Sequence, residues 1–276
     1  MDTAAYCADL VRRHDPDRYF ADLFAPGAAR PHLFAIHAFN AEIARIGEIV
    51  SEPLPGEVRL QWWRDALEAG DAGGNPVAAA LMETITAFDL PRAAFRSLID
   101  ARIFDLYNDP MPDRAAFEGY AGDTASSLFQ LAAIVLAGSR GPGSADAAGH
   151  AGVAYALTGL LRAFPLHAAR RRLFLPADAF RAHSVDQESI FAGENLPSIA
   201  AALADLRAVA RAHLEESRRA LRALPPAVAP AFLPLALVEP FLRRMERPDY
   251  RPFGPVVELP QWRRQWILWR AAERGF

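Results

Sequence analysis

The sequence contains no lysine, so all 30 of its cationic side chains are arginines. Abundant alanine, arginine and proline are typical of a GC-rich genome, which makes an arginine cluster less informative about function here than in most proteins. The formal net charge is −3. Such a near-neutral balance gives no overall attraction to nucleic acid, so none is predicted as a partner, and any anion binding must be local.

Cys7 is the only cysteine, which excludes an intrachain disulfide and fits a reducing compartment. The sequence has no uninterrupted apolar run of about 18 residues, so no transmembrane helix is predicted. The opening segment, Met1 to Tyr6, lacks the apolar stretch of a signal peptide. We therefore expect a cytoplasmic protein, or one that is peripheral on the inner, cytoplasmic face of a membrane.

Helical periodicity dominates the 276 residues, of which 52% are hydrophobic. Apolar residues recur at three- and four-residue steps between 36 and 50, which places them on one helical face. No stretch alternates apolar and polar residues as a strand would. The pattern predicts an all-α fold in one domain, 1–276, with a glycine-rich loop at 138–143. Further helices are expected at about 57–69, 76–88, 92–107, 113–137 and 197–223, with a break at 53–56.

The expected helix 31–52 contains the run His37-Ala38-Phe39-Asn40-Ala41. It resembles the first signature helix of the squalene/phytoene synthases, in which a pair of aspartates is followed by a third one turn later. Those acids hold Mg²⁺, which prefers oxygen ligands. Here the resemblance places Ala44, Arg45 and Glu48 at the acid positions. Ala44 offers no ligand, Arg45 brings a positive charge, and Glu48 is interpreted as solvated or paired with Arg45.

The segment 152–176 is similar to the second signature helix of the same family. Arg162 stands at the family arginine, and Arg172 with Phe174-Leu175-Pro176 matches the end of the motif. The polar positions of the family are not kept, because its acids fall on Ala163, Leu166 and His167. Together the two helices give these cavity positions: His37, Asn40, Ala44, Arg45, Glu48, Tyr155, Gly159, Arg162, Ala163, Leu166 and His167.

Two residues near the end of this segment carry separate expectations. Pro165 removes a backbone donor inside the helix, so a kink is predicted there. His167 has a ring that could bind a metal, but a lone histidine is more typical of hydrogen-bonded structure. No metal ligand is assigned in this sequence.

The resemblance implies an isoprenoid-synthase-type helical bundle with a central cavity between helices 33–50 and 150–166. The run Leu161 to Pro176 is closest to a non-catalytic branch that contains a mitochondrial complex I assembly factor. That branch implies an assembly or chaperone-like factor without a cofactor, whose partner is a respiratory complex I subunit or assembly intermediate. The cavity could hold an apolar or isoprenoid-like ligand.

Two other functions stay open. The first is an active, Mg²⁺-dependent prenyltransferase that condenses two prenyl diphosphates, which the missing acids disfavour. The second is an enzyme that catalyses a different reaction in the same cavity, but the sequence shows no nucleophile–base pair that would support it.

The arginines of the second motif allow two interpretations. Arg170, Arg171 and Arg172 could join Arg162 in a site for a phosphate or a phospholipid headgroup, because guanidinium groups match such oxyanions. Alternatively, they are solvated side chains at a helix end. Arg162 lies on an otherwise apolar helix, so we predict that it is partly buried and paired with Glu42 or Glu48.

The C-terminal segment has three tryptophans, Trp262, Trp266 and Trp269, at helical spacing among arginines. An aromatic stripe beside basic residues is typical of a helix that lies at a membrane surface or contacts a partner. The competing interpretation is a terminal helix whose tryptophans pack on the bundle.

Overall fold

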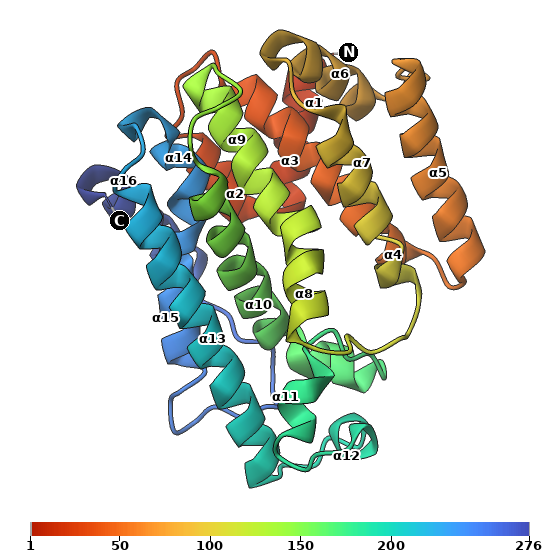
Figure 1. Ribbon diagram of the computed structural model, residues 1–276, viewed down its shortest axis with the longest axis vertical. Helices are drawn as coiled ribbons and strands as arrows, with labels where there is room; N and C mark the ends of the chain where they lie inside the picture. The colour runs from red at the N-terminus through yellow and green to blue at the C-terminus, as the bar shows by residue number, and fades with distance from the viewer. Residues whose placement is uncertain (1, 276) are drawn as a thin grey trace.

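The computed structural model describes residues 2–275, and every regular element among them is helical (Figure 1). This confirms the predicted all-α class. Four short segments are 3₁₀ or π turns: η1 (Phe104–Leu106), the π-helix η2 (Gly122–Ser126), η3 (Pro226–Val228) and η4 (Leu233–Leu237). The α-helices are α1 (Thr3–His14), α2 (Pro16–Asp22), α3 (Arg30–Ala44), α4 (Ile46–Ile49), α5 (Pro53–Ala69), α6 (Pro76–Phe88), α7 (Arg92–Ala101), α8 (Arg114–Ala121), α9 (Ser127–Ala137), α10 (Ala145–Ala169), α11 (Ala177–Arg181), α12 (Gln187–Phe191), α13 (Pro197–Leu221), α14 (Ala229–Phe232), α15 (Val238–Arg244) and α16 (Gln261–Arg274).

The first signature helix is divided into α3 and α4 by a turn at Arg45. α3 is buried over most of its length and packs against α1 and α6, so it forms the centre of the N-terminal half. The break expected at 53–56 is wrong, because α5 starts at Pro53. Proline is well suited to the first turn of a helix, where its missing N–H would have no partner in any case.

The helices α8 and α9 are joined by the π-helical segment η2, so 114–137 is one continuous helical stretch, as predicted. η2 lies against α10 at Gly152, where a Cβ atom would come within 2.0 Å of the Ser126 hydroxyl oxygen. The same Ser126 hydroxyl donates to the carbonyl oxygen of Gly149 at 2.9 Å. The absence of a side chain at Gly152 therefore sets how closely the second signature helix approaches η2.

The second signature helix is α10, which runs beside the long helix α13 (Figure 1). The prediction of a helix over 197–223 is confirmed by α13. Pro165 lies inside the last turns of α10 but does not end it, since the helix continues to Ala169. The kink at Pro165 stays a prediction.

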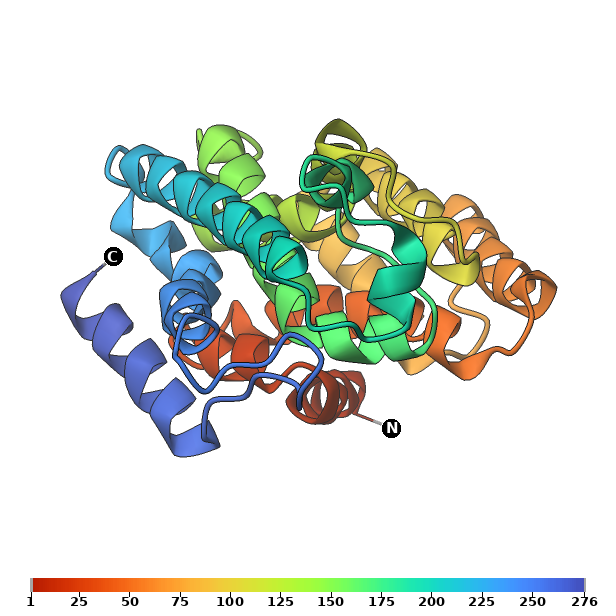
Figure 2. The same cartoon turned by 90° about the horizontal axis from the view of Figure 1, so that it is seen from below.

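The C-terminal helix α16 packs across α2 and η4, and Figure 2 shows it along the outer edge of the bundle. Just before it, Pro226–Arg244 is long and apolar enough to cross a membrane, the one such segment in residues 2–275. The absence of a transmembrane helix that the sequence predicts therefore stays a prediction. Half of the segment is buried inside the bundle, and a core helix of a bundle has the same composition, so this is weak support for a span.

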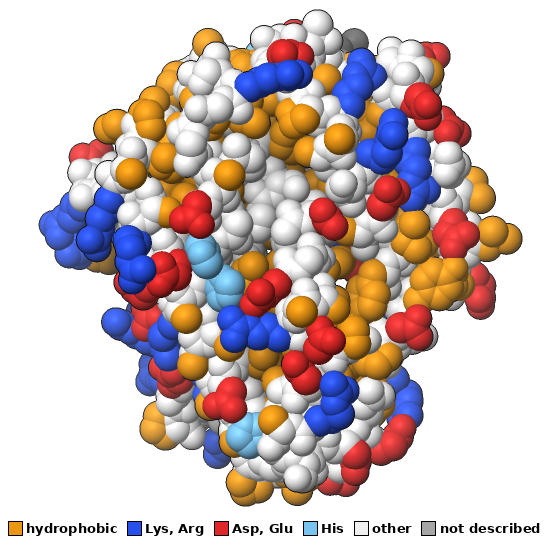
Figure 3. Space-filling model, viewed as in Figure 1, with side chains coloured by type: hydrophobic (Ala, Val, Ile, Leu, Met, Phe, Trp, Pro, Cys, Tyr) orange, Lys and Arg blue, Asp and Glu red, His pale blue; other side chains and the backbone are white. Residues whose placement is uncertain are grey.

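The face of the molecule in Figure 3 carries acidic and basic side chains interspersed with apolar ones. No large area of one charge covers this face. The mixture follows from the near-neutral balance of the sequence.

Candidate functional site

A hollow lies where α4 and the end of α3 face the C-terminal part of α10. We call it the central hollow. Its wall combines apolar side chains with three arginines and two carboxylates. The residues that line it are Ala44, Gly47, Glu48, Arg102, Asp105, Tyr120, Leu160, Leu166, His167, Arg170, Arg172 and Phe174.

The hollow brings together the two signature helices where the resemblance places the family's cavity. Of the predicted cavity positions, Ala44, Glu48, Leu166 and His167 line it. Glu48 is exposed and forms no ion pair with any residue of 2–275, so it is solvated rather than paired with arginine. Two facing helices thus contribute only one carboxylate to the hollow.

A partly buried polar network forms one wall of the hollow. The Arg102 guanidinium donates to Asp105 Oδ2 at 3.0 Å, to the Tyr120 hydroxyl at 2.7 Å and to Asn40 Oδ1 at 3.2 Å. The Tyr120 hydroxyl in turn donates to Asp105 Oδ1 at 2.8 Å. Asn40 was predicted as a cavity residue, and its side-chain oxygen takes part in this network as an acceptor. Arg102, Asp105 and Tyr120 lie in a segment without any recognisable motif, so sequence reasoning missed them.

His167 lies edge-on against the Phe174 ring, with 4.8 Å between the ring centroids. Burial, with additional effects of Arg170 and Arg172, lowers the pKa of His167 from 6.5 to about 4. The imidazole is therefore neutral at neutral pH. Its neighbours are two guanidinium groups, which would oppose a bound cation.

The donor set of the hollow does not fit a magnesium diphosphate site. Mg²⁺ needs several oxygen ligands in a regular octahedral arrangement. Glu48 and Asp105 are the only carboxylates in the lining, and Asp105 already accepts from Arg102 and Tyr120. Within the described residues, no group of three or more His, Cys, Asp or Glu side chains lies close enough together to hold a metal ion.

Arg162 does not point toward α3, and the predicted pairing with Glu42 or Glu48 is wrong. Its guanidinium donates to Glu258 Oε1 at 2.8 Å and to the carbonyl oxygen of Val257 at 3.0 Å. It also stacks over the Phe241 ring, with 3.7 Å between the guanidinium carbon and the ring centroid. The partial burial was predicted correctly, but Arg162 faces the C-terminal segments because it lies on the other side of α10.

The proposed arginine cluster is also divided by the structure. Arg170 and Arg172 line the central hollow. Arg171 points elsewhere and donates to Glu188 Oε1 at 2.6 Å. Arg162 is held by Glu258. The four arginines therefore do not form one anion site, and an anion-binding role stays a prediction only for the pair in the hollow.

Several predicted cavity positions lie behind the hollow or beside it. Arg45 donates to the His14 ring at 3.1 Å, and Gly159 and Ala163 lie on a more exposed side of α10. The buried His37 lies 2.8 Å from Asp22 Oδ2.

The Arg18 guanidinium lies over the Tyr155 ring, with 4.7 Å between the guanidinium carbon and the ring centroid. Burial raises the pKa of Tyr155, so its hydroxyl stays protonated. Tyr155 and His37 both serve the packing of α2 rather than the central hollow.

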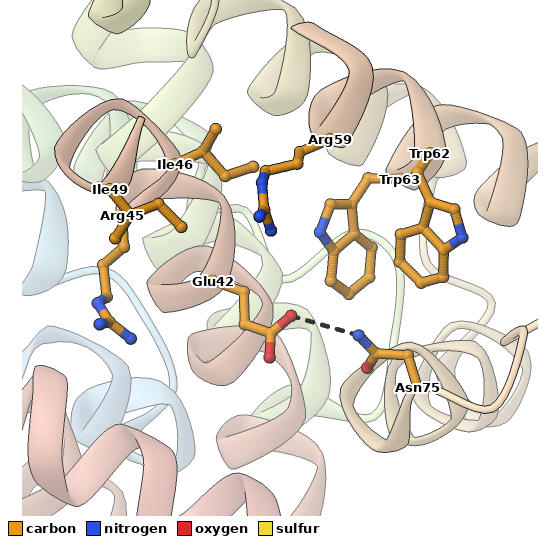
Figure 4. Close-up of a pocket in the computed structure, with 8 residues that line it drawn as sticks. All are labelled: Glu42, Arg45, Ile46, Ile49, Arg59, Trp62, Trp63 and Asn75. Atoms are coloured by element: carbon orange, nitrogen blue, oxygen red, sulfur yellow. Dashed lines mark hydrogen bonds between the residues drawn. The ribbon is translucent and has the colours of Figure 1, made fainter. Parts of the chain in front are cut away.

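A second hollow, the α4–α5 groove, opens on the outer side of α3 (Figure 4). Glu42 lies in its floor and accepts from the Asn75 side chain at 3.4 Å. Trp62 and Trp63 form an edge-to-face pair on one wall, with 5.0 Å between their ring centroids. The other residues in the lining are Arg45, Ile46, Ile49 and Arg59.

Apolar side chains of the groove and of the neighbouring face of α5 are open to solvent. Ile49 is 56% exposed, Leu54 68% and Val58 63%. Leu54, Val58 and Trp62 follow one another at four-residue steps, so they share one outer face of α5. Sequence reasoning missed this stripe because the break expected at 53–56 divided it.

The three C-terminal tryptophans also face solvent. Trp262 is 69% exposed, Trp266 49% and Trp269 51%, whereas Leu268 on the opposite face is fully buried. The interpretation of this segment as a terminal helix whose tryptophans pack on the bundle was correct for the helix but not for the tryptophans. α16 packs on the bundle, but it does so without its tryptophans.

Comparison with known proteins matches the squalene/phytoene synthase family over residues 11–270. The chain belongs to this family. A squalene synthase from Alicyclobacillus acidocaldarius shares the fold, with a TM-score of 0.79 and 21% identity over 92% of this chain and 95% of that one. The family assignment and the isoprenoid-synthase-type bundle expected from the sequence are thereby confirmed.

Two curated relatives separate the functions within the family. A bovine protein named NADH dehydrogenase (ubiquinone) complex I, assembly factor 6 is 32% identical over 93% of this chain and 78% of its own length. A phytoene synthase from Thermus thermophilus is 27% identical over 95% of this chain and 90% of its own length. The higher identity to the assembly factor supports the non-catalytic interpretation over the prenyltransferase alternative.

Proposed function

We propose that this protein is a non-catalytic assembly factor that supports the biogenesis of respiratory complex I. The observation that carries the proposal is the 32% identity to a complex I assembly factor across nearly the whole chain. The matched region covers 93% of this chain and therefore includes the helices that form the central hollow. Its partner would be a complex I subunit or an assembly intermediate.

The chemistry of the central hollow supports this proposal. A prenyltransferase of this family must neutralise two diphosphates with Mg²⁺, and this hollow offers solvated Glu48 and the already engaged Asp105. Arg102, Arg170 and Arg172 would repel a metal ion. Leu160, Leu166 and Phe174 give the hollow an apolar wall, so an isoprenoid-like ligand without a metal is part of the proposal. We assign no cofactor.

An assembly factor needs a surface for its protein partner, and we assign the α4–α5 groove to that role. Leu54 and Val58 are exposed apolar side chains on α5, the helix that also carries Trp62 and Arg59 of the groove lining. Such a mixture of aromatic, aliphatic and arginine side chains is typical of a protein interface core. The partner contact would bury this apolar stripe, which otherwise lies in water.

The test is complementation in the organism that encodes the chain. Deleting the gene should lower NADH-dependent ubiquinone reduction in isolated membranes and the amount of assembled complex on native gels. The wild-type chain should restore both. Leu54→Glu/Val58→Glu should fold normally, because both positions are exposed, but should fail to restore the complex. Arg140→Gln, a change at an exposed residue outside the groove, is the control. A normal complex I in the deletion strain would overturn the proposal.

A second assay tests the prenyltransferase alternative directly. Purified protein is incubated with farnesyl or geranylgeranyl diphosphate and Mg²⁺, and the products are separated by chromatography. We expect no condensed product above a control without protein, and no rise in melting temperature when Mg²⁺ and diphosphate are added together, since no site links them to the folded state. Magnesium-dependent squalene or phytoene would support the alternative.

For localisation, we propose the cytoplasmic compartment.

A further inference from the structure

α16 has an inner face and an outer face with different partners. On the inner face, Leu268 is fully buried and Arg264 donates to Asp17 on α2 at 2.9 Å. On the outer face lie the three tryptophans Trp262, Trp266 and Trp269, which are 69%, 49% and 51% exposed. Figure 2 shows α16 at the margin of the bundle, with no element on its outer side. The inner contacts fix the orientation of the helix, so its indoles are held outward.

The outer face of α16 is also basic. Arg263 and Arg270 lie three residues before and four residues after Trp266, so they share its side of the helix. The Arg270 guanidinium lies over the Trp266 ring, 5.1 Å from its centroid. The helix contains four arginines and one carboxylate, Glu273. Only Arg264 among these arginines forms an ion pair with another residue of 2–275.

A groove of arginines continues this surface onto α15. It is lined by Arg243, Arg244, Arg247 and Arg263, with Pro240 and Leu259. Its acidic contacts are few, as Arg244 and Arg247 share one carboxylate, that of Asp249, at 3.0 and 3.5 Å.

A second carboxylate beside the groove is also shared. Arg243 pairs with Glu239 at 2.8 Å, and Glu239 in turn also pairs with Arg211. The groove therefore keeps an excess of positive charge beside the tryptophans.

We propose that the outer face of α16 and the adjoining arginine groove bind the surface of an anionic phospholipid bilayer. The three indoles would enter the headgroup region, where tryptophan is favoured because its ring is apolar and its N–H is polar. The guanidinium groups would bind lipid phosphates, which they match in geometry and charge. This inference goes beyond the proposed function, because it concerns a different surface from the α4–α5 groove and a different partner.

The arrangement of this face favours a membrane over a protein partner. Trp262, Trp266 and Trp269 project from one helix on the outside of the fold, at i, i+4 and i+7, so they form one exposed aromatic stripe. An amphipathic helix lying in the plane of a bilayer has this arrangement, with basic residues beside the aromatic ones. The positive charge of the arginines beside the tryptophans is complementary to the extended negative surface of an anionic bilayer.

The test is sedimentation of the full chain with vesicles of phosphatidylcholine alone or of equal parts phosphatidylcholine and phosphatidylglycerol. We expect binding to the anionic vesicles, weakened by added salt because exposed charges are screened. Trp262→Ala/Trp266→Ala/Trp269→Ala should lower the affinity by about a hundredfold, and Arg243→Gln/Arg263→Gln by about tenfold. Trp62→Ala and Arg140→Gln, which change an exposed tryptophan and an exposed arginine elsewhere, should leave it unchanged.

A second measurement covers the case in which a variant folds poorly. Vesicles with brominated acyl chains should quench the tryptophan fluorescence of the wild-type chain, and circular dichroism shows whether each variant keeps its helices. Absence of binding to anionic vesicles, or equal binding by the wild type and the folded triple tryptophan variant, would overturn the inference. Because these assays use purified protein and lipid, their outcome is independent of the complementation result.

Discussion

Arg264 donates from one nitrogen to both carboxylate oxygens of Asp17, at 2.9 and 3.1 Å, and so joins two residues that are 247 positions apart. Their side chains are only 16% and 10% exposed. Burial raises the pKa of Asp17, and the charge of Arg264 opposes that rise. The pair attaches the C-terminal helix to α2 near the N-terminus of the chain.

The first prediction concerns this pair. Arg264→Met should lower the free energy of unfolding by about 3 kcal/mol, because it leaves the carboxylate of Asp17 buried without its partner. Asp17→Asn/Arg264→Met should cost less than the single change, since the double variant has no unpaired charge. Urea unfolding of the wild type and the two variants measures both effects. If the double variant is the least stable of the set, the ion pair is not what holds the helix.

The second prediction separates the contacts of Arg162. Glu258 is 57% exposed, so Glu258→Gln should cost less than about 1 kcal/mol, as exposed ion pairs do. Arg162→Ala removes in addition the stacking on Phe241 and the hydrogen bond to the chain at Val257, and should cost about 2 kcal/mol. Chemical denaturation of both variants gives the comparison. Equal losses would mean that the ion pair alone accounts for the role of Arg162.

Much of the fold could be predicted from sequence because apolar spacing and chain breaks are local signals. The helices at 76–88 and 197–221 have the predicted bounds within two residues. Pro53 was misread because proline ends one helix or begins the next, and the choice depends on which neighbours pack against the following turn. The interruption at Arg45 likewise has no local signal in the sequence.

The site was harder to predict, because a residue's position on a helix does not say which neighbour it meets. Arg162 was expected to face α3, but it contacts a segment almost a hundred residues later in the chain. The network of Arg102 depends on a loop and a separate helix that only the tertiary fold brings together. The spacing of Trp262, Trp266 and Trp269 correctly predicted that they share one face of a helix. Because α16 has apolar residues on two faces, the spacing could not say which face packs on the bundle. Burial of Leu268 decided which face points inward.

The third prediction uses the low pKa of His167. Its pKa falls from 6.5 to about 4 on folding because of burial and the nearby Arg170 and Arg172. Between these two values the unfolded chain binds a proton that the folded chain does not, so the free energy of unfolding falls as the pH is lowered through this window. His167→Asn should reduce that loss, leaving the contributions of His14 and His213, whose pKa values burial also lowers.

The measurement is the melting temperature of the wild type and His167→Asn at a series of pH values from 7 down to about 4, at constant ionic strength. The melting temperature of the wild type should fall more steeply toward acid pH than that of His167→Asn. The two curves should therefore converge at the acid end and separate toward neutral pH. Replacing an exposed residue of the same helix end, as in Arg171→Gln, provides the control. Parallel curves for all three proteins would show that His167 does not titrate in this range.

The last prediction compares two glycines of the second signature helix, seven residues apart. At Gly152 a Cβ would lie 2.3 Å from the backbone nitrogen of Ser126, and such a contact cannot be relieved by rotating a side chain. Gly152→Ala should therefore lower the free energy of unfolding by about 1–3 kcal/mol or more through overpacking against η2. At Gly159 a Cβ would meet nothing within 4 Å. Gly159→Ala should raise stability by about 0.5–1 kcal/mol, because alanine favours the helix. Opposite signs in denaturant unfolding would confirm that the approach of α10 to the π-helical segment requires a glycine, whereas two stabilising changes would mean that η2 can move away.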